Sequence, residues 1–152
     1  METQGFQLAQ FNVARLLAPL EDPRVSGFVS QLETIYAAAE SAPGFVWRMK
    51  LDDAPTLRSP TDQLLLVTLS VWESVEALRA FVYRGAHAGP LRRRAEWFEK
   101  LEGNSVVLWW VRRGTLPRVE QGFARLKFLR RNGPTAKAFT FDEPFPLPRE
   151  AG

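Results

Sequence analysis

The chain contains no cysteine, which excludes disulfide bonds, cysteine-ligated zinc and thiol chemistry. It has a single histidine, which disfavours a multi-histidine metal site. Long hydrophobic runs are also missing: the longest, Leu64 to Leu69, is interrupted by Thr68 and is far too short to span a membrane. No basic segment followed by an apolar stretch opens the chain. We therefore expect a cytoplasmic protein with no signal peptide and no membrane partner.

The residues that are present have the composition of one globular domain. The 152 residues are 45% hydrophobic and 24% charged, which predicts a single domain over 1–152 with its own core. Their charge is uneven, because residues 84–131 hold twelve Lys and Arg against four Glu. These basic residues fall on expected helices at spacings typical of solvated faces, and no nucleic-acid-binding motif accompanies them. We expect no nucleic-acid partner.

Hydrophobic periodicity and turn residues predict an α+β fold. From Phe6 to Ala14 apolar residues alternate, as in a half-buried strand. The order of elements matches a ferredoxin-like, split βαβ sheet. Strands are expected at 6–14, 44–50, 63–72, 104–112 and 138–141, helices at about 23–42, 74–83, 91–101 and 117–132, a loop over 51–62 and a proline-rich tail over 142–152.

One face of such a sheet is expected to carry no helix. A face too aromatic for water and too polar for an ordinary core is usually closed by a second copy of the chain around a cavity. We therefore expect a homodimer that uses this face. The residues assigned to it are Gln10, Asn12, Trp47 or Arg48, Thr68, Ser70, Trp72, and Trp109 or Trp110.

Six groups of residues carry a resemblance to a known family: Leu8–Arg15, Pro43–Arg48, Ser70–Ser74, Phe81–Arg84 with His87, Arg92–Arg94 with Trp97 and Phe98, and Leu108–Val111. They resemble an uncharacterised bacterial family of the dimeric α+β barrel superfamily. The resemblance runs from about residue 7 to 146 and implies that fold. The superfamily includes antibiotic-biosynthesis monooxygenases without a cofactor, haem-binding chlorite dismutases and monooxygenases, and muconolactone isomerase-like enzymes, so the resemblance transfers no single reaction.

His87 is expected in an irregular link between the helix that ends near Tyr83 and the arginine-rich helix. It is a candidate general base near neutral pH or an axial haem ligand, and equally a structural imidazole. The resemblance implies that this segment lies beside the barrel mouth.

Three strand tryptophans either line a pocket for a flat ligand or pack at a dimer interface. Polar side chains on a closed face must bond to each other, to water or to a ligand, and Asn12 could donate to a developing oxyanion. The predicted site comprises the catalytic residues His87 and Asn12 and the ligand-binding residues Gln10, Trp47, Ser70, Trp72, Tyr83, Arg84 and Trp110.

Three functions remain open from these residues. The first is a monooxygenase-like oxidoreductase without a cofactor, acting on an aromatic or polyketide-like ligand that the tryptophans hold. The second is a haem protein with His87 as proximal ligand, and the third is a non-catalytic dimer that binds a small ligand. For the catalytic function we predict one cavity per subunit that holds the side chains of Asn12, Trp72 and His87 within about 10 Å of each other.

Overall fold

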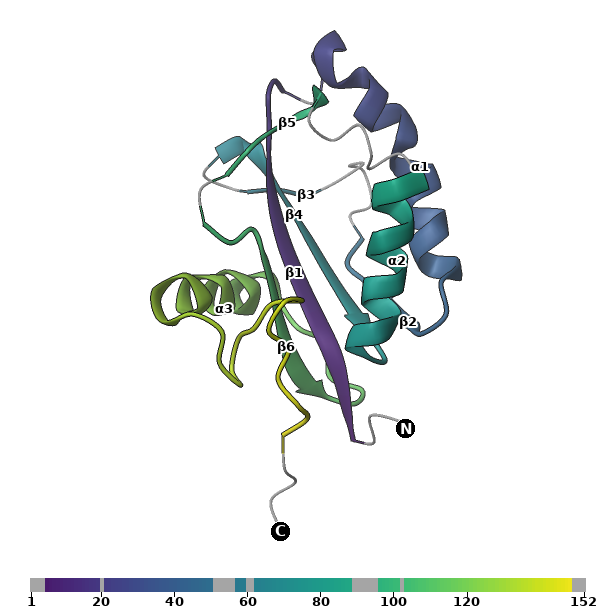
Figure 1. Cartoon of the computed structure of the whole chain (residues 1–152). Coiled ribbons are helices and arrows are strands. Elements are labelled where there is room, and N and C mark those ends of the chain that lie inside the picture. Colours follow the sequence, from purple (N-terminus) through teal and green to yellow (C-terminus); the bar gives the residue numbers. More distant parts are fainter. Residues whose placement is uncertain are drawn as a thin grey trace.

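The computed structural model describes residues 5–19, 21–50, 57–59, 62–88, 96–101 and 103–148, with the backbone alone at 57–59, 62–63 and 85–88. Figure 1 shows the elements in chain order: β1 (Phe6–Leu16), a short 3-10 helix η1 (Pro23–Val25), α1 (Ser26–Ser41), β2 (Phe45–Arg48), β3 (Leu57–Ser59), β4 (Asp62–Trp72), α2 (Val75–Ala88), β5 (Phe98–Glu99), β6 (Val106–Arg112) and α3 (Val119–Asn132).

The antiparallel sheet is built around its two longest strands, β1 and β4. β2 and β3 pair with different parts of β4, and β6 and β5 pair with successive parts of β1. This order is that of a ferredoxin-like sheet, as predicted. The register places Gln10 opposite Ser70 and Asn12 opposite Thr68.

The helix boundaries follow local capping chemistry. Asp22 Oδ1 accepts a hydrogen bond of 2.8 Å from the backbone N–H of Arg24, at the turn that leads into α1. Ser74 Oγ accepts one of 3.0 Å from the N–H of Ala77 at the start of α2. α3 stops at Gly133, whose φ of 74° lies in the left-handed region that glycine tolerates best. All three signals were predicted from the sequence.

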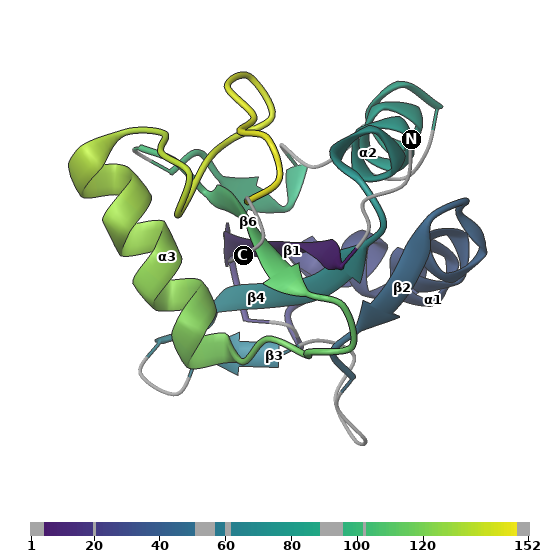
Figure 2. The same cartoon turned by 90° about the horizontal axis from the view of Figure 1, so that it is seen from below.

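Both faces of the sheet carry helices, α1 and α2 on one side and α3 on the other (Figure 2). Leu8 and Trp72 share a buried cluster with Val75 and Leu78 of α2. Even-numbered residues of β1 and β4 therefore face α1 and α2. The odd-numbered residues face α3, in a cluster that includes Ala9, Phe11, Val67, Leu69, Val107, Trp109, Leu126 and Leu129.

This arrangement corrects the predicted helix-free face. The face with Gln10, Asn12, Ser70 and Trp72 is the one that α1 and α2 cover. The wholly apolar opposite face, which looked suited to those helices, packs against α3 instead. A homodimer built on the predicted face is therefore wrong for this structure, while a homodimer as such remains a prediction.

Four segments also differ from the prediction. α2 continues through Gly85 to Ala88, because one glycine costs a helix only about 1 kcal/mol relative to alanine. Residues 98–99 form strand β5 rather than the end of a helix, and residues 91–95 lie outside the described residues. β3 forms within the expected loop, and 138–141 contributes a single bridge between Phe139 and Leu108 rather than a strand.

The C-terminal tail packs on its own chain. The indole Nε1 of Trp110 donates a hydrogen bond of 3.0 Å to the carbonyl of Phe145. Arg79 of α2 donates one of 2.6 Å to the carbonyl of Phe141, so the tail also ties α2 to the edge of the sheet.

In the described part of the chain, no helix combines the length and the hydropathy needed to cross a bilayer.

Candidate functional site

Four polar side chains form a block on the α1/α2 face, which we call the polar strip: Gln10 and Asn12 of β1, and Thr68 and Ser70 of β4. Directly opposed residues of antiparallel strands have Cβ atoms about 5 Å apart, so these side chains are within reach of one another. Apolar clusters lie on both sides of the strip along the strands. One contains Leu16 and the other contains Leu8. The strip therefore interrupts the otherwise apolar contact between the sheet and helices α1 and α2.

Three of the four side chains belong to one hydrogen-bond chain that starts at a buried indole. Trp72 Nε1 donates to Ser70 Oγ at 3.0 Å, and Ser70 Oγ donates to Gln10 Oε1 at 2.8 Å. Gln10 Nε2 then donates to Thr68 Oγ1 at 3.5 Å. Because each hydroxyl and amide has one preferred orientation in this chain, the floor of the strip is fixed before any ligand arrives.

Asn12 stands outside this chain. Among the described residues, its Oδ1 is the one buried side-chain nitrogen or oxygen atom that has no hydrogen-bond partner. An unpaired buried acceptor costs about 1–3 kcal/mol, and native proteins rarely keep one. The carbonyl oxygen of Asn12 is therefore ready to accept a hydrogen bond from a donor that the described part of the chain does not supply.

The strip is open to solvent at Thr68. On the same face of β4, Leu66 is 3% exposed and Trp72 is 1% exposed, yet Thr68 between them is exposed. The helices thus cover the strand on both sides of Thr68 and leave the strip accessible there.

Arg48 borders the strip from β2, where it pairs with Ser70 in the register. Its Nε donates a hydrogen bond of 2.9 Å to Glu40 Oε2, and its guanidinium lies 3.9 Å from the centre of the Tyr36 ring. Two residues of α1 therefore hold this cation at the edge of the site.

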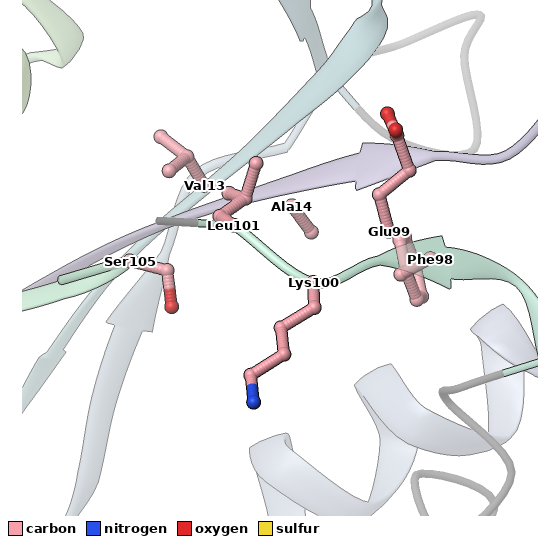
Figure 3. A pocket seen from close by; sticks show the side chains of 7 residues that line it. All are labelled: Val13, Ala14, Phe98, Glu99, Lys100, Leu101 and Ser105. Atoms are coloured by element: carbon pink, nitrogen blue, oxygen red, sulfur yellow. The ribbon is translucent and has the colours of Figure 1, made fainter. Parts of the chain in front are cut away.

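A pocket of about 330 Å³ adjoins the strip where β1 changes partner (Figure 3). Ala14 of this pocket is the next residue after Asn12 on the α1/α2 face of β1. This pocket was not predicted from the sequence, because its wall over 98–101 was expected to be helical. It is lined by Val13, Ala14, Phe98, Glu99, Lys100, Leu101 and Ser105.

Comparison with known proteins identifies the family. Residues 7–151 match the family described as domain of unknown function DUF3291. The chain belongs to this family. No functionally curated protein matches the DUF3291 chain significantly.

Solved structures similar to the DUF3291 chain share its fold at low identity. A conserved protein of Methanosarcina mazei Go1 is 9% identical with a TM-score of 0.50, over 72% of this chain and 95% of that one. SnoaB, a cofactor-independent oxygenase of Streptomyces nogalater, is 20% identical with a TM-score of 0.47, over 74% and 98%. A candidate antibiotic-biosynthesis monooxygenase of Chloroflexus aurantiacus is 17% identical with a TM-score of 0.43, over 74% and 93%.

Family and fold agree with the predicted resemblance. The chain is a member of a family of unknown function, and its α+β fold with a ferredoxin-like sheet is the predicted one. Likeness at these identities shows the fold alone, and it says nothing of the reaction.

The strand tryptophans of the DUF3291 chain do not line one common pocket. Trp47 packs against the cluster on the α3 side. A register shift between Phe45 and Trp47 decides to which face of the sheet its side chain projects. Trp72 is buried, with its ring centre 5.3 Å from that of Phe81. Trp110 packs against Phe139, and its indole N–H donates a hydrogen bond to the Phe145 carbonyl of the tail. The prediction that Trp47 shares a pocket with the other two is wrong.

Three predicted site residues lie on α2. Tyr83 is 65% exposed and Arg84 is also exposed. His87 lies within α2 and not in an irregular link, which corrects its predicted position. The side chain of His87 lies outside the described residues, and its catalytic and haem-binding roles remain predictions.

The structure brings Gln10, Asn12 and Ser70 together, as predicted, and Trp72 joins them through its indole N–H. The described pocket contains neither Asn12, Trp72 nor His87, so it is not the cavity that was predicted. Among the described residues, no three side chains of His, Cys, Asp or Glu gather as metal ligands.

Proposed function

We propose that this chain binds a small hydroxylated aromatic molecule at the polar strip, between the sheet and helices α1 and α2. The observation that carries the proposal is Asn12 Oδ1, a buried acceptor without a partner beside a strip that is open at Thr68. A hydroxyl group of the ligand would donate to this oxygen and remove the cost of leaving it unpaired.

The surroundings of the strip favour a flat ligand with apolar faces. Apolar clusters adjoin it at both ends, with Leu66 on one side and Trp72 on the other. A ring system can lie against these side chains while its hydroxyl meets the polar floor, which is the usual pattern of an apolar pocket with a few placed polar groups. Phenols and polyketide-like molecules have this shape.

Oxygenation of the bound ligand without a cofactor is a second candidate function. The observation that favours it is the pairing of Asn12 with Thr68, the last member of the hydrogen-bond chain, in the strand register, because the Asn12 amide N–H and the Thr68 hydroxyl can then both donate to one oxygen of the ligand. Donors held in this way stabilise a phenolate, and an electron-rich phenolate reacts with oxygen directly. The phenol proton needs an acceptor, and His87 is the predicted one.

Isothermal titration calorimetry with 2-naphthol tests the binding function. We expect Asn12→Leu to weaken binding by about tenfold, the value of one buried hydrogen bond. Asn132→Ala is the matched control, because Asn132 only bonds to the Phe128 carbonyl at the end of α3. Equal affinity of the wild type and Asn12→Leu, or absence of binding to the wild type, would contradict the proposal.

Oxygen uptake tests the second function. A dihydroxynaphthalene bound by the wild type should consume oxygen faster than it does free in buffer, and Asn12→Leu should remove the acceleration. If the ligand binds and the rate of oxygen consumption does not change, binding is the function and oxygenation is not.

A further inference from the structure

We infer that the pocket beside Asn12 holds an anionic end of the ligand, with Lys100 as its counter-ion, so that the ligands are hydroxylated aromatic carboxylates. This inference rests on the proposed function and names the chemical class of its ligand.

The pocket arises from a change of partner along β1. β6 pairs with β1 up to Asn12, and the N–H of Val13 still donates to the carbonyl of Ser105 at 2.9 Å. Pairing with β5 then begins at Arg15. Between the two ladders the sheet has a gap of about 330 Å³, which lies within the range of small-molecule sites.

The gap continues the polar strip. Asn12 and Ala14 project from the same face of β1, about 7 Å apart as alternate residues of a strand are. The small side chain of Ala14 leaves room at this point, and Ser105 directly precedes Val106, the residue that pairs with Asn12. A two-ring ligand whose hydroxyl meets Asn12 is long enough to reach the gap.

The charged residues of the pocket point to opposite sides. Figure 3 shows the side chains of Lys100, Ser105 and Ala14 on one side of the sheet edge and that of Glu99 on the other. Glu99 Oε2 lies 2.8 Å from Nε of Arg15, which neutralises it. Of the residues that line the pocket, Lys100 is thus the one that presents charge on the side of Asn12.

Two further contacts hold the walls of the gap in place. The ring of Phe98 is fixed edge-on against Phe28, with centres 4.8 Å apart, and gives the pocket a rigid apolar wall. Arg130 of α3 donates a hydrogen bond of 2.8 Å to the carbonyl of Asn104, which holds the backbone beside Ser105 in place from the opposite face of the sheet. Because Lys100 presents the charge on the side of Asn12, the electrostatic potential of the gap favours a carboxylate over a neutral group.

A pair of probes that differ only in the carboxylate tests the inference. We expect 6-hydroxy-2-naphthoate to bind the wild type more tightly than 2-naphthol does, in calorimetric titrations at low salt. Lys100→Met should weaken the acid by about tenfold and leave 2-naphthol unchanged, because a charge-assisted contact is lost. Lys127→Met, which changes an exposed lysine of α3, is the control and should bind both probes like the wild type.

The outcomes separate this inference from the proposed function. If both probes bind, Asn12→Leu weakens both and Lys100→Met changes neither, the function stands and the inference is overturned. If the acid binds more weakly than 2-naphthol, the inference is overturned as well. If neither probe binds the wild type, the proposed function fails and the inference fails with it.

Discussion

Replacing Asn12 by leucine should stabilise the ligand-free protein, although Asn12 lies in the middle of a central strand. The two side chains have the same branching and the same number of heavy atoms, and leucine is the larger, so the exchange leaves no cavity. It removes the buried Oδ1 that has no partner, and an unsatisfied acceptor costs about 1–3 kcal/mol. Asn12 is only half-buried, so the added apolar contact with neighbours such as Val106 contributes less than 1 kcal/mol. We expect the free energy of unfolding to rise by about 1–2 kcal/mol.

Urea unfolding followed by tryptophan fluorescence measures this change. Ser70→Ala is the matched control on the neighbouring strand, because Ser70 accepts from Trp72 and donates to Gln10. Its removal leaves the buried indole N–H of Trp72 and the half-buried Oε1 of Gln10 without this partner, and should lower the free energy of unfolding by about 1–3 kcal/mol. The two changes in one strip should thus have opposite signs.

A less stable Asn12→Leu variant would refute this reasoning. It would mean that Asn12 already has a partner in the ligand-free protein, such as an ordered water, and that no stability is given up at this position. A more stable variant that has also lost ligand binding would show instead that Asn12 serves function at the expense of the fold.

Three further results are expected in urea unfolding. Gly122→Ala should destabilise by about 1–2 kcal/mol, because overlap of the new Cβ with the Phe11 ring outweighs a helix-propensity gain of about 1 kcal/mol; a more stable variant would contradict this. Arg113 holds the pKa of Glu73 below its usual value, so the stability lost in Glu73→Gln should be seen at neutral pH and should vanish as the pH falls through that lowered pKa; a constant difference would argue against it. A chain that ends after Phe141 loses the hydrogen bond from Trp110 to the Phe145 carbonyl and the contact of Phe145 with Phe139, and should lose about 1–3 kcal/mol; an unchanged midpoint would count against the tail contact.

Local signals in the sequence predicted most of the elements. Alternation along β1 correctly separated Phe11 from Gln10 and Asn12, because side chains of a strand project alternately to its two faces. The same parity on β4 correctly set Trp72 on the face of Asn12. Register between two central strands follows from such patterns when one face is wholly apolar.

The side on which each helix packs was not predictable in the same way. The alternation of side chains along a strand defines the two faces of the sheet, but it does not predict which helix covers which face. That choice depends on the path of the whole chain. α3 takes the apolar face through Leu126 and Leu129, and this left the polar face to α1 and α2. A partner subunit was therefore inferred where helices of the same chain lie.

The candidate site was predicted in part for related reasons. Gln10, Asn12 and Ser70 were found because polar residues at inward strand positions are unusual. Trp47 was misplaced because a one-residue register shift reverses a side chain and leaves no mark in the sequence. Lys100 was missed because it lies in a segment whose apolar spacing resembled a helix.

A sheet with helices on both faces has only its rim left for joining another copy. Strand edges are the usual starting points of uncontrolled polymerisation, and proteins guard them with short pieces of chain or bulges. On the β6 side, the bridge from Phe139 to Leu108 occupies part of the rim. On the opposite rim, β2 is short and carries the register shift after Phe45. The segment around Phe139 and the irregular strand β2 thus guard the two rims against open-ended strand addition.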